Sequence, residues 1–229
     1  MREKSIGFCR SLIPKIYADI KTHTRRVIIP QPIVNVMGKY SSDGILNPVD
    51  EGGDGIFYLE KLDYRWEPTG EYEAIGRPRY APGDILWVKE EYYEYGHWVD
   101  DGETKGGKRK RKFVPIGNAP IYYVDNLPEN VTVLKGKYRE DIGYFWRNSR
   151  FMPRRVARLF LRLKEVRAER IRDITFEDMI KEGICAKTEY MGRYQFVDLW
   201  DSLNKKREFG WMDNPFVFVY VFKRLKYYG

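Results

Sequence analysis

A basic segment, Lys21-Thr22-His23-Thr24-Arg25-Arg26, holds residue types that could bind an anion or activate a nucleophile. Cations placed this close together repel one another unless an anion or a carboxylate lies between them. Such neighbours favour the neutral form of the lysine amine, and a neutral Lys21 could act as a general base or activate the Thr24 hydroxyl. A solvated basic loop is the alternative interpretation, because short basic runs are frequent.

A second segment, Gly83-Asp84-Ile85-Leu86-Trp87-Val88-Lys89-Glu90, supplies a carboxylate that could partner this basic run. Glu90 could orient the lysine or accept hydrogen bonds from the amine of a substrate. In the alternative interpretation, Glu90 only neutralises Lys21 or Arg26 in a structural ion pair. The pattern therefore predicts either a polar site or a buried charge pair.

Further side chains are candidates for contacts with a nucleic acid. Two aromatic residues could stack on bases, and four arginines could contact phosphates. The alternatives are a place in the core for the aromatic residues and a solvated surface for the arginines. The candidates are Trp87, Tyr92, Arg25, Arg26, Arg154 and Arg158.

The composition favours an anionic partner. The 229 residues carry a formal net charge of +8 and give a pI near 9.3, which fits nucleic acid most simply, although an ordinary basic protein is the alternative. Two histidines and two cysteines far apart in the sequence match no zinc or disulfide pattern, so we expect no metal and no cofactor. No apolar stretch is long enough to span a membrane, and residues 1–10 lack the apolar core of a signal peptide. We therefore expect a cytoplasmic protein.

In the first half of the chain, the predicted elements are short and separated by turns. Residues 12–18 form a helix that Asp19 ends in a left-handed conformation, and residues 27–34 form a strand that its prolines restrict to an edge or split. A second strand covers residues 85–93. Residues 100–112 are so rich in charge and glycine that we expect a disordered loop, or alternatively a basic arm that touches phosphates.

The second half has clearer patterns. Strands are predicted over 158–166 and 216–223, the latter apolar on both faces and therefore central in a sheet. Helices are predicted over 175–182 and 195–205, from a capping box and from apolar spacing. We expect one α+β domain over residues 1–229, built on a small, partly closed β-barrel with flanking helices and with long loop insertions around 38–80 and 96–140.

These segments, taken together and in order, resemble a bacteriophage and prophage family of ASCH-like proteins of the PUA-like superfamily. The two segments described above carry the resemblance in the first half of the chain. In the second half it rests on Phe151-Met152-Pro153-Arg154, Arg158, Val166-Arg167-Ala168-Glu169-Arg170-Ile171, Asp173-Ile174, Glu182-Gly183-Ile184, Leu199-Trp200-Asp201-Ser202-Leu203-Asn204 and Asp213-Asn214-Pro215-Phe216.

The resemblance implies a PUA-like barrel, a fold associated with RNA binding and with recognition of modified bases. A related small bacterial ASCH protein removes acetyl from acetylcytidine with a Lys, a Thr and a Glu, which Lys21, Thr24 and Glu90 match. Asp19 departs from the pattern, because the family usually has Gly there. Phe151 and Arg155 also depart from it, because the phage relatives usually have His and Trp at these positions.

Two functions follow as hypotheses. The chain binds RNA or a modified nucleobase or nucleoside in a pocket lined by Lys21, Thr24 and Glu90, or it is an amidohydrolase that deacetylates acetylcytidine-like nucleosides. A ribonuclease is a distant third, since paired carboxylates are not obvious. If the chain is encoded by a phage, its location is the host cytoplasm. The sequence leaves the oligomeric state open.

Overall fold

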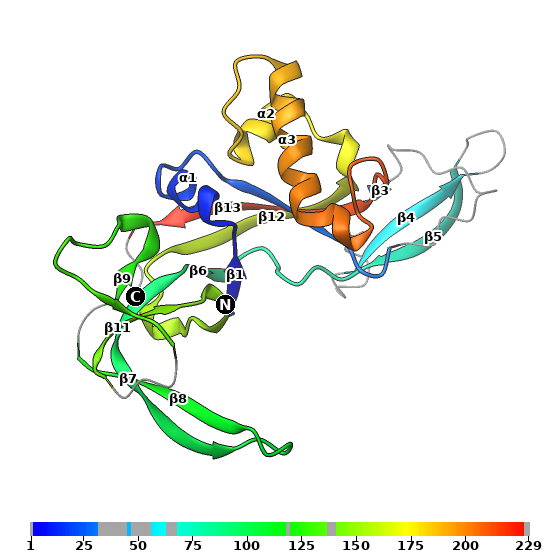
Figure 1. Cartoon of the computed structure of the whole chain (residues 1–229). Coiled ribbons are helices and arrows are strands. Elements are labelled where there is room, and N and C mark those ends of the chain that lie inside the picture. Colours follow the sequence, from blue (N-terminus) through cyan, green and yellow to red (C-terminus); the bar gives the residue numbers. More distant parts are fainter. Residues whose placement is uncertain are drawn as a thin grey trace. The chain divides into compact units, whose positions relative to one another are not determined.

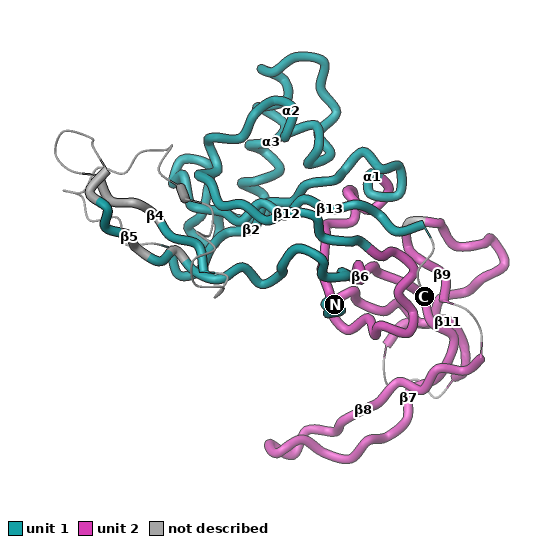
Figure 2. The backbone as a smooth tube through the Cα atoms, turned by 180° about the vertical axis from the view of Figure 1, so that it is seen from behind, with its two compact units in different colours: residues 1–4, 15–86, 161–228 teal, residues 5–14, 87–160, 229 magenta. Residues whose placement is uncertain are grey.

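A computed structural model of the chain describes residues 2–31, 45–46, 56–62, 68–117, 120–136 and 141–226. Figure 1 shows a structure made mostly of strands with few helices, which confirms the predicted α+β class. The chain divides into two compact units (Figure 2). Unit 1 comprises residues 1–4, 15–86 and 161–228, and unit 2 comprises residues 5–14, 87–160 and 229.

One five-stranded sheet contains strands from all four regions that we predicted to share one sheet. Its two outer strands are not paired with each other in the described part of the chain, so the sheet is open and the expected barrel is not closed. In spatial order the strands are β1 (Glu3–Gly7), β6 (Ile85–Lys89), β12 (Phe160–Arg170), β13 (Phe216–Leu225) and β2 (His23–Val27).

Strand β2 begins earlier than predicted. The sequence placed a strand over residues 27–34, but β2 covers His23–Val27, so the basic segment itself is the strand. Residues 32–34 lie outside the described residues. The charged strand can be buried because β13 pairs with it antiparallel, with Val219 opposite Arg25 and Tyr220 opposite Thr24.

Two helices of unit 1 cover one face of β13 and β2. Helix α2 (Phe176–Lys181) begins at the predicted cap, where the Thr175 hydroxyl accepts a hydrogen bond from the Asp178 backbone N–H at 3.2 Å. Helix α3 (Glu189–Asn204) begins six residues earlier than predicted, with Thr188 as its cap. The helices pack their apolar side chains on Val217 and Val219. Figure 1 shows α2 and α3 on one side of β13.

The opposite face of β13 carries aromatic side chains. Phe218 and Tyr220 contact Phe57 and Tyr80 edge-on, with ring centroids 5.3 and 5.2 Å apart. Phe57 begins strand β4 in a separate sheet. This sheet has the order β3 (Ile45–Leu46), β4 (Phe57–Leu62) and β5 (Pro68–Gly76).

Unit 2 contains a third sheet. Strand β7 lies between β11 and β8 and also pairs with β9, while β10 pairs parallel with β11. The strands are β7 (Tyr92–Glu103), β8 (Arg109–Pro115), β9 (Ile121–Tyr122), β10 (Val133–Leu134) and β11 (Gly143–Arg147).

The disordered loop predicted over residues 100–112 is wrong, because β7 and β8 form one long hairpin there. Cross-strand ion pairs replace the missing apolar burial: Arg109 donates to Asp100 at 2.8 Å, and Lys110 pairs with Asp101 at 2.5 Å. Charge alone therefore misled the prediction, since opposite charges facing each other across two strands support a ladder.

The remaining helices are short. The predicted helix over 12–18 is split into a 3-10 turn and the one-turn helix α1 (Ile13–Tyr17), after which Asp19 adopts φ 56°, as predicted. No helix within the described ranges is long and apolar enough to span a bilayer. The 3-10 turns are η1 (Arg10–Leu12), η2 (Tyr123–Asp125), η3 (Ser149–Phe151), η4 (Arg154–Val156), η5 (Ile171–Asp173) and η6 (Lys205–Arg207).

Candidate functional site

Lys21 is buried in unit 1, where its amine faces Glu182. The Nζ atom donates to the Glu182 carboxylate at 2.6 Å, to the Glu182 carbonyl at 2.8 Å and to the His23 carbonyl at 2.8 Å. Three acceptors, one of them a carboxylate, match the three donors of an ammonium group. The structural ion pair considered for Lys21 therefore exists, but Glu182 is its carboxylate.

Arg25 lies in the same network and bonds three carboxylates. It donates to Glu169 at 2.7 Å, to Asp178 at 2.6 Å and to Glu182 at 3.2 Å, and its side chain is 1% exposed. Burial alone would lower the pKa of this guanidinium, but the charges of Glu182 and Glu169 raise it above its ordinary value. Arg25 therefore cannot contact phosphates, which corrects its assignment as a nucleic-acid-binding residue.

Asp178, on α2, joins a second arginine to the network. Burial alone would raise the pKa of its carboxyl group, but the hydrogen bond and charge of Arg25 and the charge of Arg167 hold it below its ordinary value. Arg167 from β12 bonds both Asp178 and Glu169. The three carboxylates are thus neutralised by Lys21 and two arginines, and no acidic or histidine cluster suited to a metal ion occurs among the described residues.

His23 borders this network of charged side chains. Burial lowers the pKa of its imidazole, and the positive charges of Arg167 and Lys181 lower it further, against the opposing effect of Asp178. Its Nε2 atom lies 3.9 Å from the Asp178 carboxylate, while Nδ1 lies 3.0 Å from the Thr22 hydroxyl.

Thr24 and Arg26 occupy the opposite face of β2, because neighbouring residues of a strand point to opposite sides. Thr24 is buried beside Tyr220, its partner in β13, whereas Arg26 is exposed. Burial raises the pKa of Tyr220 to about 12. Thr24 therefore extends away from the carboxylates that hold Lys21 and Arg25.

Glu90 belongs to unit 2 and bonds an arginine there. Arg158 donates to the two Glu90 oxygens at 3.3 and 3.1 Å, and it also pairs with Asp125. Its guanidinium lies 3.6 Å from the ring centroid of Tyr122, whose pKa is raised to about 12, mainly by burial. Because Lys21 and Thr24 belong to unit 1, their convergence with Glu90 on one pocket stays a prediction.

A pocket of about 170 Å³ adjoins Glu90 within unit 2. Arg10 lies over the Tyr123 ring, 3.8 Å from its centroid, and Tyr93 stacks on the same ring at 6.0 Å. Arg10 also bonds Glu91. The pocket thus combines acidic oxygens, cations and a stacked aromatic system. It is lined by Phe8, Cys9, Arg10, Ile13, Lys89, Glu90, Glu91, Tyr123 and Ser149.

The other predicted ligand contacts in unit 2 have different surroundings. Tyr92 is 1% exposed and packs with Met152 and Val156, so it belongs to the core and cannot offer a face to a base. Trp87 is half-buried, with the Lys89 amine 5.5 Å from its ring centroid. Arg154 is half-buried over Phe160, with 4.6 Å between the guanidinium and the ring centroid.

The acidic partners of the basic segment were not predicted. Glu169, Asp178 and Glu182 were not assigned to it. Each lies more than 140 positions from Lys21 or Arg25 in the sequence, so spacing gave no signal. Glu169 and Glu182 do lie in segments that carry the resemblance, and this was a signal that could have identified them as partners of the basic segment.

Arg10, Glu91 and Tyr123 were missed for a similar reason, since they come from separate turns that only the fold assembles at the pocket. Comparisons with protein-family models, with curated proteins and with solved structures find no match for this chain.

Proposed function

We propose that this chain binds RNA or a modified nucleobase or nucleoside, and that one base occupies the pocket beside Glu90. The observation that carries the proposal is a half-buried carboxylate, that of Glu91 next to Glu90, at the wall of a pocket that also contains a guanidinium stacked on a tyrosine ring. The resemblance to ASCH-like proteins of the PUA-like superfamily supports the same class of ligand, as does the net charge of +8.

The pocket chemistry suits a base that carries an exocyclic amine. A carboxylate accepts hydrogen bonds from the N4 amine of cytosine, and a carboxylate has about four acceptor sites. Glu91 supplies such a carboxylate at the pocket, where its side chain is 23% exposed and accepts from Arg10. Arginine planes are among the surfaces on which unstacked bases lie, so the exposed Arg10 guanidinium, held over the Tyr123 ring, provides the stacking side.

The size of the pocket limits the ligand. Sites for drug-sized molecules typically measure about 300–1,000 Å³, so a pocket of about 170 Å³ fits a single base rather than a dinucleotide. The rest of an RNA chain would then lie outside the pocket, where cationic side chains contact phosphates.

Calorimetric titration with cytidine, acetylcytidine and uridine tests the proposal. We expect the two cytidines to bind and uridine to bind more weakly, because uridine lacks the amine. Glu91→Gln should weaken cytidine binding roughly tenfold to a hundredfold, since a hydrogen bond to a charged group contributes about 1.5–3 kcal/mol. Glu129→Gln, an exposed change in the same unit, should leave the affinity unchanged.

Tyr123→Leu tests the stacking side without changing the carboxylate, so it remains informative if Glu91→Gln fails to fold. The absence of binding by all three nucleosides would overturn the proposal. The same samples, analysed by liquid chromatography after incubation, distinguish binding from turnover. Release of cytidine from acetylcytidine by the wild-type chain would identify an amidohydrolase instead.

A further inference from the structure

The outer part of the β7–β8 hairpin carries more positive charge than its own ion pairs neutralise. Residues 100–112 include six cations and three carboxylates. Nearly all of these residues are exposed, and Figures 1 and 2 show the hairpin extending from the rest of the unit 2 sheet. The cations are Lys105, Lys108, Arg109, Lys110, Arg111 and Lys112.

The cations occupy both faces of the hairpin. Arg109 and Arg111 alternate with Lys110 and Lys112 along β8. One face of the strand therefore carries the two arginines, and the other carries the two lysines. Asp100 pairs with Arg109 on one face, and Asp101 pairs with Lys110 on the other. A positive excess therefore remains on both faces of the ribbon.

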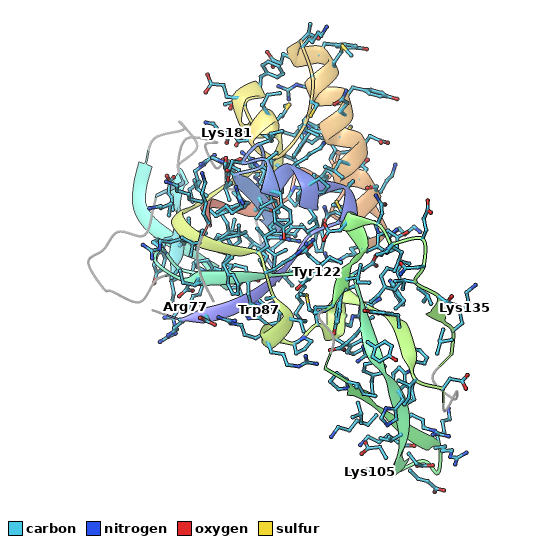
Figure 3. All side chains as sticks on the ribbon, turned by 90° about the vertical axis from the view of Figure 1, so that its left-hand side faces the viewer. Arg77, Trp87, Lys105, Tyr122, Lys135 and Lys181 are labelled. Atoms are coloured by element: carbon cyan, nitrogen blue, oxygen red, sulfur yellow. The ribbon has the colours of Figure 1, made fainter. Side chains whose placement is uncertain are left out.

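Three lysines have no carboxylate partner in the described part of the chain: Lys105, Lys108 and Lys112. Lys105 and Lys108 flank the two glycines of the turn, and Figure 3 shows Lys105 at the end of the hairpin. Nearby like charges repel one another, and exposed side chains here bury no apolar surface in return. An anion placed along this part of the hairpin would relieve the repulsion.

The base of the hairpin is held firmly. The rings of Trp98, Phe113 and Phe145 pack edge-on, with centroids 5.3 to 6.4 Å apart. The Arg147 guanidinium lies 4.4 Å from the centroid of the Phe113 ring. Gly96 permits close approach of the two strands, because a Cβ at this position would lie 2.2 Å from the Val114 carbonyl oxygen. An anchored base allows the two charged strands to be presented in a fixed register.

We infer that the β7–β8 hairpin is an arm that binds the phosphate backbone of RNA outside the nucleobase pocket. The inference rests on the proposed function and assigns a second surface to it. A protein partner fits less well, because protein interfaces are depleted of lysine and enriched in aromatic side chains, whereas residues 100–112 contain no aromatic residue.

The experiment measures RNA affinity against salt concentration for the full chain. The probe is a fluorescent single-stranded oligoribonucleotide rich in cytidine. Replacing Lys105, Lys108 and Lys112 with Gln should flatten the slope of log affinity against log salt by about 2, since each phosphate contact contributes roughly 0.7 for a single strand. Replacing the same lysines with Arg should preserve the slope, because phosphate contacts survive that change.

A matched control removes equal charge elsewhere. Lys205, Lys206 and Arg207 form an exposed 3-10 turn in unit 1, and their replacement with Gln should leave the slope within about 0.7 of the wild type. Equal losses in both triple variants would overturn the inference, because net charge would then explain the effect. So would binding of anionic vesicles, but not RNA, through the three hairpin lysines.

Cytidine titration separates this inference from the proposed function. The hairpin triple Gln variant should bind cytidine as the wild type does, because these lysines do not line the pocket. If cytidine binds but the salt slope for RNA is unaffected by the hairpin changes, the arm is excluded and the pocket stands. If no nucleoside binds while the hairpin variant still flattens the slope, the pocket is excluded and the arm stands.

Discussion

The Lys21 amine donates to the Glu182 carboxylate at 2.6 Å, across 161 positions of the sequence. Both side chains are buried, with exposures of 1% and 8%. Removing one partner of a buried ion pair leaves an uncompensated charge, whereas an exposed pair contributes little. This relationship makes Lys21 part of the packing of unit 1, whatever further role it has.

Lys21→Met should therefore lower the free energy of unfolding by about 3–5 kcal/mol, because Glu182 would remain buried with fewer cations. Urea unfolding followed by tryptophan fluorescence measures the change. Lys181→Met is the matched control, since its side chain is 46% exposed and lies 3.8 Å from Asp178. We expect that control to cost less than about 1 kcal/mol. Similar losses in both variants would contradict the buried network.

Arg25 and Arg26 should behave differently although they are neighbours. Arg25→Gln removes a buried guanidinium from three carboxylates, so we expect a lower melting temperature. Arg26→Gln changes an exposed residue, so we expect a loss of at most about 1 kcal/mol. Differential scanning calorimetry compares the two. A more destabilising Arg26 variant would show that the faces of β2 have been assigned in reverse.

His23 predicts a stability change in mildly acidic solution. Its folded-state pKa is lowered, so the unfolded chain binds the proton more tightly, and stability falls as pH drops through the unfolded value of about 6.5. The destabilisation is complete below the folded pKa. Unfolding measured from pH 7.5 to 5 should be less pH-dependent in His23→Gln, while His97→Gln serves as the control. Identical profiles of stability against pH for wild type and His23→Gln would show that protonation of His23 does not cause the destabilisation.

A substitution at Gly96 tests how firmly the base of the β7–β8 hairpin is held. An added methyl would meet the Val114 carbonyl at 2.2 Å and the Phe113 ring at 2.8 Å, so Gly96→Ala should cost about 1–3 kcal/mol. Gly106, in the hairpin turn, has open space around the same position, so Gly106→Ala should leave stability nearly unchanged. Hydrogen exchange of the β7 and β8 amides should rise in the first variant alone.

The sequence predicted correctly those elements that depend on residue types close together in the chain. The Thr175 cap, the left-handed Asp19 and the doubly buried β13 each follow from residue types within a short window. Strand β2 did not, because His23–Val27 is polar and its burial depends on carboxylates from β12 and α2. The hairpin was missed for the same physical reason. Its ladder depends on charge pairs across the strands, not on apolar alternation.

The candidate site was predictable only in part. Glu90 was predicted to be a site residue, and it lines a pocket. Tyr92 was assigned to base stacking. Neighbouring residues of a strand point to opposite faces, and this alternation places Tyr92 in the core instead. Arg10 and Tyr123 gave no motif in the sequence, because 112 intervening residues separate the two halves of their stack.

Strand β13 lies between β12 and β2, although it follows β2 by nearly the whole length of the chain. During synthesis, β2 and its buried charges therefore emerge long before the strand that pairs with them. A nascent chain must carry an unsatisfied strand edge until residue 217 and its neighbours leave the ribosome, and such edges invite misassociation. Unit 1 can therefore be completed only late in synthesis, and a chain truncated before β13 would leave β2 without this partner.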